Sequence, residues 1–217
     1  PKPNTAKNLE HAFASWRSYS LSPPTIRRLL ELYPDDPCNA PPHAVTNCSR
    51  FESTLDRGAQ WRRGADIGGD LVMISGRRKM CELYAGELGA SQPVYSYRFD
   101  QRLWNRNITD GVQHFDNVAF SFQNISGLLG ASPAFDSHVR LARTIGEAYV
   151  RFVYDLDPNP RANASNSSAL PRWPRYDLDR PVNMVLNASG NYLEDDTYRK
   201  EGIAFMNSPA VARELLA

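Results

Sequence analysis

Only one segment of this sequence has the composition of a buried parallel strand, and this restricts the folds open to the chain. Residues 93–99, PVYSYRF, are rich in β-branched and aromatic side chains, and a polar loop follows them. A self-sufficient parallel sheet needs several strands joined by crossover helices. The 217 residues are enough to bury a core in one large domain or two small ones. We therefore expect an α/β chain that supplies part of a larger sheet.

Periodic apolar residues predict helices on both sides of this strand. Residues 26–33 place their apolar side chains on one face, and Pro34 ends the pattern. A second helix is expected from about Asp66 to residue 88, with a start that Gly68 and Gly69 delay. A third begins at Asp136 as N-cap. The buried stripe expected on the third helix consists of Val139, Ala142, Ile145, Ala148, Tyr149, Phe152 and Val153.

The last part of the chain predicts a short hairpin and a final helix. Residues 182–187 and 191–193 flank the turn sequence Ala188-Ser189-Gly190, and the final helix is expected from Thr197 to about residue 206. We expect residues 1–65 to form a helical, irregular, cap-like region and residues 66–217 to form the sheet-and-helix portion of the same domain.

Charge and hydropathy exclude several classes of protein. The 25 lysines and arginines nearly balance 24 aspartates and glutamates, and hydrophobic residues make up 41% of the chain. This composition is too apolar for a disordered protein and too balanced for a nucleic-acid-binding arm. No run approaches the ~18 apolar residues that a membrane span needs. We expect a globular chain with no transmembrane segment and no nucleic-acid partner.

Six Asn-x-Ser/Thr sequons indicate a glycoprotein of the secretory pathway, because chance predicts about two in a chain of this composition. The first residues contain no apolar core of a signal peptide, so we expect the signal to lie on a part that has been removed. The expected localisation is secreted, and the chain is expected to be a fragment. The candidate glycosylation sites are Asn47, Asn107, Asn124, Asn163, Asn166 and Asn187.

The use of the three cysteines is consistent with a protein of the secretory pathway, where disulfides form. Cys38 and Cys48 flank a proline-rich segment, and a disulfide between them would stabilise the chain by about 2–3 kcal/mol. Zinc bound by these cysteines and His43 is the weaker interpretation, since no fourth ligand has a standard spacing. Cys81 is expected to be a buried helix thiol; the alternative is a disulfide to another chain. We expect no metal and no cofactor.

Common catalytic motifs are absent. The chain contains no Gly-x-Ser-x-Gly elbow, no P-loop, no Gly-x-Gly-x-x-Gly, no His-Glu-x-x-His and no complete calcium loop. Each of the four histidines is ordinarily a structural or solvated residue. His114 differs in its setting, because it lies on the loop after the predicted strand. A loop after a late strand of an α/β sheet is where the histidine of a Ser-acid-His triad lies.

Several segments resemble the type-B carboxylesterase/lipase family, which includes cholinesterases and secreted fungal lipases. PVYSYRF at 93–99 resembles a late sheet strand of that family, and GVQH at 111–114 resembles the segment that presents its catalytic histidine. Gly69-Asp70 resembles a family GD segment. WPRY at 173–176, followed by the hairpin and the acidic residues 194–196, resembles the family's C-terminal end. The segments occur in the family's order over residues 20–206.

The resemblance implies the C-terminal part of an α/β-hydrolase, a mostly parallel sheet flanked by helices with a C-terminal β-hairpin, completed by a separate N-terminal chain. It implies a carboxylic ester hydrolase of the serine esterase or lipase type, acting on a small-molecule or lipid ester. His114 would be the general base, while the nucleophilic serine, the oxyanion loop and the acid would lie on the companion chain. Asn117 occupies a position that is commonly acidic in the family, and Asp116 precedes it. By itself this chain is expected to be inactive.

Two other functions stay open. One is a non-catalytic, cholinesterase-like adhesion or binding glycoprotein that has lost the serine. The other is an unrelated secreted α/β glycoprotein in which His114 is structural.

Overall fold

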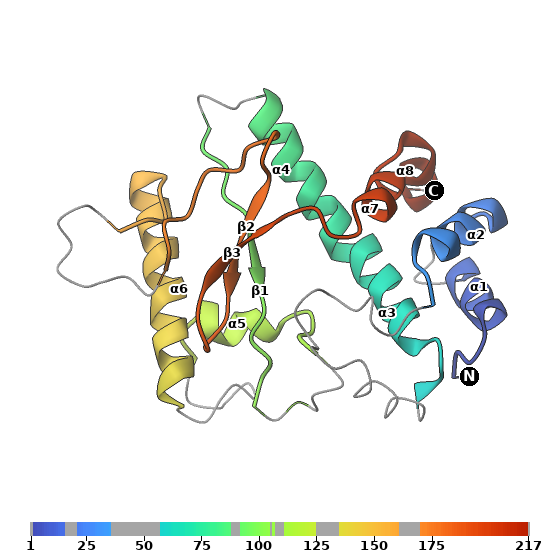
Figure 1. Ribbon diagram of the computed structural model, residues 1–217, viewed down its shortest axis with the longest axis horizontal. Helices are drawn as coiled ribbons and strands as arrows, with labels where there is room; N and C mark the ends of the chain where they lie inside the picture. Colours follow the sequence, from blue (N-terminus) through green and yellow to red (C-terminus); the bar gives the residue numbers. More distant parts are fainter. Residues whose placement is uncertain are drawn as a thin grey trace. The chain divides into compact units, whose positions relative to one another are not determined.

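The structure of the chain, a computed structural model, describes residues 2–15, 21–35, 57–87, 92–104, 106, 111–124, 135–160 and 170–216 (Figure 1). Helices and a small three-stranded sheet make this a mixed α/β chain, as expected. The chain divides into two compact units, Pro1–Met80 with Thr197–Ala217, and Cys81–Asp196. The boundary expected at residues 65 and 66 stays a prediction.

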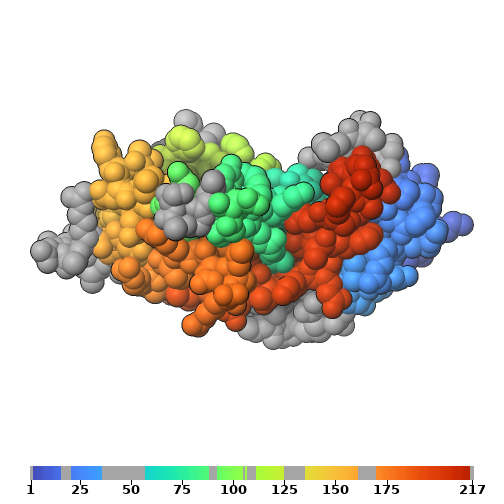
Figure 2. All heavy atoms as spheres, turned by 90° about the horizontal axis from the view of Figure 1, so that it is seen from above, coloured from blue at the N-terminus to red at the C-terminus, as the bar shows by residue number. Residues whose placement is uncertain are grey.

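The first unit is helical and joins the two ends of the chain. It contains α1 (Ala6–Ala14), α2 (Pro23–Leu32), α3 (Trp61–Gly69), α7 (Lys200–Met206) and α8 (Pro209–Leu216). The carboxylate of Glu214 accepts hydrogen bonds from the backbone N–H of Ser22 at 2.8 Å and from the hydroxyl of Thr25 at 2.9 Å. This contact ties α8 to the start of α2, and Figure 2 shows α8 (red) directly beside the N-terminal helices (blue).

Apolar side chains from all parts of this unit form its core. The expected helix at 26–33 is confirmed, since Ile26, Leu29, Leu30 and Tyr33 are all buried and Tyr33 caps the helix just before Pro34. The core cluster consists of Leu9, Phe13, Leu21, Ile26, Leu29, Leu30, Tyr33, Ile67, Leu71 and Met206.

The long middle helix begins earlier than its glycines indicate. We expected a start at Asp66 or later, but α3 begins at Trp61 and contains both Gly68 and Gly69. It continues as a π-helical turn, η3 (Asp70–Ile74), and then as α4 (Ser75–Glu87). Two glycines in a helix cost about 1 kcal/mol each. The full burial of Ile67 offsets that cost, because tertiary packing overrides propensity.

The last predicted helix was also misplaced. It begins at Lys200 rather than Thr197, because Arg199 adopts a left-handed backbone with φ 46°. A further helix, α8, follows at Pro209 and was not predicted. Proline is favoured in the first turn of a helix, so Ser208-Pro209 restarts the helix after a short break.

The second unit contains the sheet, whose strands are β1 (Tyr97–Phe99), β2 (Val182–Leu186) and β3 (Tyr192–Asp195) in the order β1-β2-β3. β1 pairs with β2 in parallel, with Tyr97 opposite Met184. β2 and β3 form the expected antiparallel hairpin, with Met184 opposite Leu193. The predicted strand at 93–99 is therefore present, but only its last three residues form a ladder.

Two helices, α5 (Asp116–Ser121) and α6 (Asp136–Asp155), pack on the face of the sheet that carries Tyr97 and Met184. The side-chain amide of Gln123, just after α5, lies over Gly146 of α6. The core cluster consists of Leu103, Ala119, Phe120, Leu141, Ala142, Ile145, Ala148, Leu170, Trp173, Met184 and Leu186.

The predictions for α6 were correct at its centre and wrong at its ends. Phe135, not Asp136, is the N-cap residue. Ala142, Ile145 and Ala148 are buried, whereas Phe152 is 38% and Val153 is 74% exposed. The ring of Phe152 still packs on that of Tyr95 at a centroid distance of 5.9 Å, whereas Val153 is largely exposed, so the buried stripe ends within the last turn of the helix.

Candidate functional site

His114 lies in a tight turn immediately before α5, on the chain that leaves the carboxyl end of β1. The backbone N–H of Asp116 donates to the carbonyl of Gln113 at 3.2 Å, so His114 and Phe115 are the two central residues of a four-residue turn. Phe115 has φ 81° and ψ −13°. These angles are those of the third residue of a type II turn, a position that glycine usually occupies. The sequence predicted the loop, but glycine rather than phenylalanine would signal this turn type.

The carboxylate of Asp116 closes the turn from inside. It is 2% exposed, and one oxygen accepts the backbone N–H of Gln113 at 2.9 Å. The other oxygen lies 3.6 Å from a guanidinium nitrogen of Arg106. Asp116 therefore fixes the conformation of the turn.

The imidazole of His114 is exposed, in contrast to the carboxylate two residues later. Within the described part of the chain its one recorded contact is with the ring of Phe115, edge to face, at a centroid distance of 6.3 Å. Among the described residues, none forms a hydrogen bond with either ring nitrogen of His114. A rigid backbone that carries an accessible imidazole is a suitable geometry for proton transfer.

Aromatic side chains around the turn divide into exposed and buried members. Phe115 and Phe122 are 61% and 80% exposed, whereas Phe120 is 2% exposed and packs on Phe99 at a centroid distance of 5.2 Å. Phe120 anchors α5 to the sheet. Phe115 and Phe122 are available to an apolar ligand or to another polypeptide.

The other described histidines have structural or solvated settings. His138 is buried in α6, with its ring 5.6 Å from that of Phe120 and 5.3 Å from that of Phe135. Burial lowers the pKa of His138, so its ring stays neutral near pH 7. His11 is exposed on α1.

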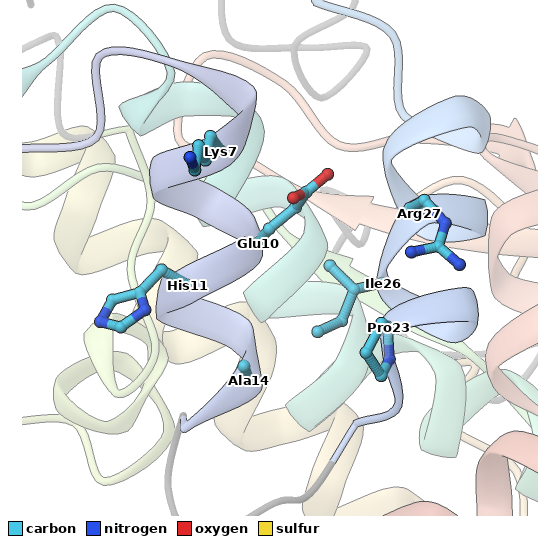
Figure 3. A pocket seen from close by; sticks show the side chains of 7 residues that line it. All are labelled: Lys7, Glu10, His11, Ala14, Pro23, Ile26 and Arg27. Atoms are coloured by element: carbon cyan, nitrogen blue, oxygen red, sulfur yellow. The ribbon is translucent and has the colours of Figure 1, made fainter.

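A cavity of about 270 Å³ lies between α1 and α2, beside His11 (Figure 3). Glu10 of α1 and Ile26 of α2 point toward each other across it. The cavity is lined by Lys7, Glu10, His11, Ala14, Pro23, Ile26 and Arg27. None of these described residues has a hydroxyl or thiol group, so they do not include the serine that the predicted esterase chemistry needs.

An ionic cluster in the helical unit was missed by the sequence analysis. Asp70, 1% exposed, accepts two hydrogen bonds from the Arg199 guanidinium at 2.7 and 2.8 Å and one from the Tyr33 hydroxyl at 2.6 Å. Burial and the charge of Asp70 raise the pKa of Tyr33, so its hydroxyl remains a donor. Desolvation raises the pKa of Asp66 to about 6, although the nearby guanidinium groups of Arg199 and Arg62 act to lower it. The cluster connects α2, η3 and α7; its one sequence signal is the four-residue spacing of the two aspartates.

The remaining site predictions fall partly outside the described residues. Cys38, Cys48 and His43 lie outside them, as do the sequons at Asn47, Asn107, Asn163 and Asn166. Cys81 is buried, as expected for a helix thiol.

Two sequons can be examined in the structure. Asn124 follows α5 and is half-buried. The side-chain amide of Asn187 donates to the carbonyl of Asp100 at 2.9 Å, and its oxygen accepts the backbone N–H of Ser189 at 2.8 Å. Asn187 therefore has a structural role in the hairpin turn whether or not it carries a glycan.

Two further searches covered the described residues. They contain no cluster of three or more His, Cys, Asp or Glu side chains that could hold a metal ion. Among the helices they form, none is long and apolar enough to cross a membrane.

Comparison with known proteins does not assign the chain to a family. No protein-family model matches the sequence, and no curated protein matches it either.

Proposed function

We propose that this chain is the C-terminal part of a secreted α/β-hydrolase and supplies the general-base histidine of a carboxylic ester hydrolase. The observation that carries the proposal is the setting of His114. Its exposed ring lies on a turn between a parallel strand and a short helix, and the turn is closed by a buried carboxylate. This order of elements is the one in which triad histidines occur in α/β-hydrolases.

The proposed chemistry divides the catalytic groups between two polypeptide segments. A serine on the companion segment attacks the ester carbonyl, and its hydroxyl proton passes to Nε2 of His114. When the tetrahedral intermediate collapses, the bond between carbonyl carbon and alcohol oxygen breaks, and the imidazolium returns the proton to the departing alcohol. A water molecule then hydrolyses the acyl-serine by the same proton transfers in the second half-reaction.

The acid that orients His114 belongs to the companion segment in this proposal. Asp116 is the single carboxylate in residues 111–124, and its hydrogen bonds hold it in the interior of the turn. A second carboxylate must therefore approach the exposed ring from outside to bind the Nδ1 proton.

Hydrolysis of a p-nitrophenyl ester by the assembled protein tests the proposal. Replacing His114 with alanine removes a base that contributes about 10²–10⁴-fold to the rate, so turnover should fall by at least that factor with the fold unchanged by circular dichroism. His11→Ala is the matched control, because His11 is an exposed histidine of the other unit, and its activity should equal that of wild type. Near-normal hydrolysis by the His114→Ala variant contradicts the proposal. Absence of hydrolysis in the assembled wild type supports the non-catalytic adhesion or binding alternative.

A further inference from the structure

Phe115 has a backbone conformation that costs an aromatic residue energy. Its φ of 81° and ψ of −13° are left-handed, so its Cβ crowds the backbone, a cost that glycine avoids. Among the described residues it is the one phenylalanine with a positive φ. The turn before α5 would therefore form more readily with glycine at position 115.

Little packing within the described part of the chain offsets this cost. Phe115 is 61% exposed, and the one ring contact recorded for it there is with His114, at a centroid distance of 6.3 Å and an angle of 68° between the ring planes. Arg199 shows the contrast, because its left-handed backbone accompanies two hydrogen bonds to the buried carboxylate of Asp70. Strain without a compensating contact is concentrated at functional sites, which makes the exposed ring of Phe115 a candidate ligand contact.

The chemistry proposed for His114 determines which part of a substrate would lie beside this ring. The imidazolium returns a proton to the departing alcohol, so the alcohol oxygen must come within hydrogen-bond distance of the imidazole. The acyl chain lies farther away, because it extends from the other side of the carbonyl carbon. Aromatic rings pair at centroid distances of about 4.5–7 Å. With its centroid 6.3 Å from that of the imidazole, the Phe115 ring is close enough to contact a group attached to the alcohol oxygen.

We propose that Phe115 determines the alcohol specificity of this site, and that its ring packs on an aromatic alcohol group of the ester while His114 protonates the alcohol oxygen. This inference rests on the proposed function and adds a substrate class to it, the esters of aromatic alcohols. An aromatic group gains more from this position than an alkyl group does, because it pairs with the phenyl ring in addition to burying apolar area. The hydrogen bond from the Gln113 N–H to Asp116 holds the backbone of the turn in place before a substrate binds.

The alcohol selectivity of the assembled protein tests this inference. Benzyl acetate and methyl acetate share the acyl group and differ only in the alcohol, so the ratio of their kcat/KM values reports on the alcohol group. We expect wild type to favour benzyl acetate. Phe115→Leu keeps an apolar side chain on the same strained backbone but removes the ring, and it should lower the benzyl-to-methyl ratio by about 2–10-fold.

Two further variants separate a contact with substrate from a general effect of the substitution. Phe115→Tyr retains the aromatic ring and should keep the wild-type ratio. Tyr154→Leu makes the matched change from an aromatic residue to leucine at an 82% exposed position near the end of α6, and it should also leave the ratio unchanged.

The outcomes distinguish this inference from the proposed function. Hydrolysis that depends on His114, with the same benzyl-to-methyl ratio in wild type and Phe115→Leu, overturns the inference and leaves the function standing. Wild type that favours methyl acetate overturns it as well. If Phe115→Leu instead releases a companion polypeptide in native mass spectrometry at an unchanged ratio, the ring contacts protein rather than substrate, and the inference is wrong. Absence of hydrolysis of both esters by the assembled wild type removes the proposed function, and the inference with it.

Discussion

Substitution of Asp70 by asparagine should destabilise the helical unit more than any exposed charge change. The variant keeps the shape of the side chain but leaves Arg199, whose side chain is 12% exposed, without its bidentate partner. It also removes an anionic acceptor from the Tyr33 hydroxyl at 2.6 Å. Breaking a buried ion pair from one side costs about 3–5 kcal/mol, because the remaining charge stays buried. We expect a loss of that size in the free energy of unfolding.

Urea denaturation followed by circular dichroism measures this loss. At a slope of about 2–3 kcal/mol per molar urea, the midpoint should fall by about 1–2.5 M. Asp179→Asn is the matched control, since it makes the same change at an exposed position and should alter stability by less than about 0.5 kcal/mol. The double variant Asp70→Asn/Arg199→Met should lose less than the sum of the single variants, because no unpaired guanidinium remains. If Asp70→Asn and Asp179→Asn shift the midpoint equally, the ion pair does not hold these helices together.

Two further predictions concern pH and backbone strain. Because the folded-state pKa of Asp66 is raised to about 6 from 3.8, the folded protein binds its proton more tightly than the unfolded chain, and stability falls as pH rises from about 4 to about 6. Over that range, wild type should lose about 3 kcal/mol relative to Asp66→Asn in urea titrations; a constant difference would contradict the raised pKa. Phe115→Gly should raise stability by about 0.5–1 kcal/mol, since glycine accepts φ 81° without strain and the ring is mostly exposed. Phe122→Gly, at an ordinary φ of −94°, should lower stability, and equal effects of the two variants would refute the strain argument.

Helix α2 and the β2–β3 hairpin could be predicted from patterns of neighbouring residues in the sequence. The apolar spacing of α2, with Pro34 after it, gave a helix whose buried face is confirmed. The Ala188-Ser189-Gly190 turn gave the β2–β3 hairpin, in which Gly190 has a positive φ of 151°. In both cases the residues that specify the element lie within it or directly next to it in the sequence.

Elements that depend on distant residues could not be predicted in the same way. The start of α3 at Trp61 depends on the burial of Ile67, which other helices provide. The position of α7 depends on Arg199, whose left-handed backbone directs its guanidinium to Asp70, 129 positions earlier. Gly202 is part of the same arrangement, because a Cβ there would lie 2.4 Å from the Tyr33 ring. The residues of each pair are too far apart in the sequence for a local pattern to reveal the contact between them.

The candidate site shows the same division between local and long-range information. The position of His114 after the predicted strand could be read from sequence, but the role of Asp116 could not. An aspartate two residues after a histidine is available to many interactions, and here the backbone of the turn uses its carboxylate. Asp116 is the single acid of residues 111–124, and its carboxylate accepts the backbone N–H of Gln113 inside the turn. The general base proposed at His114 would therefore need a carboxylate from another segment, and the proposed activity would then belong to the assembled protein rather than to this chain.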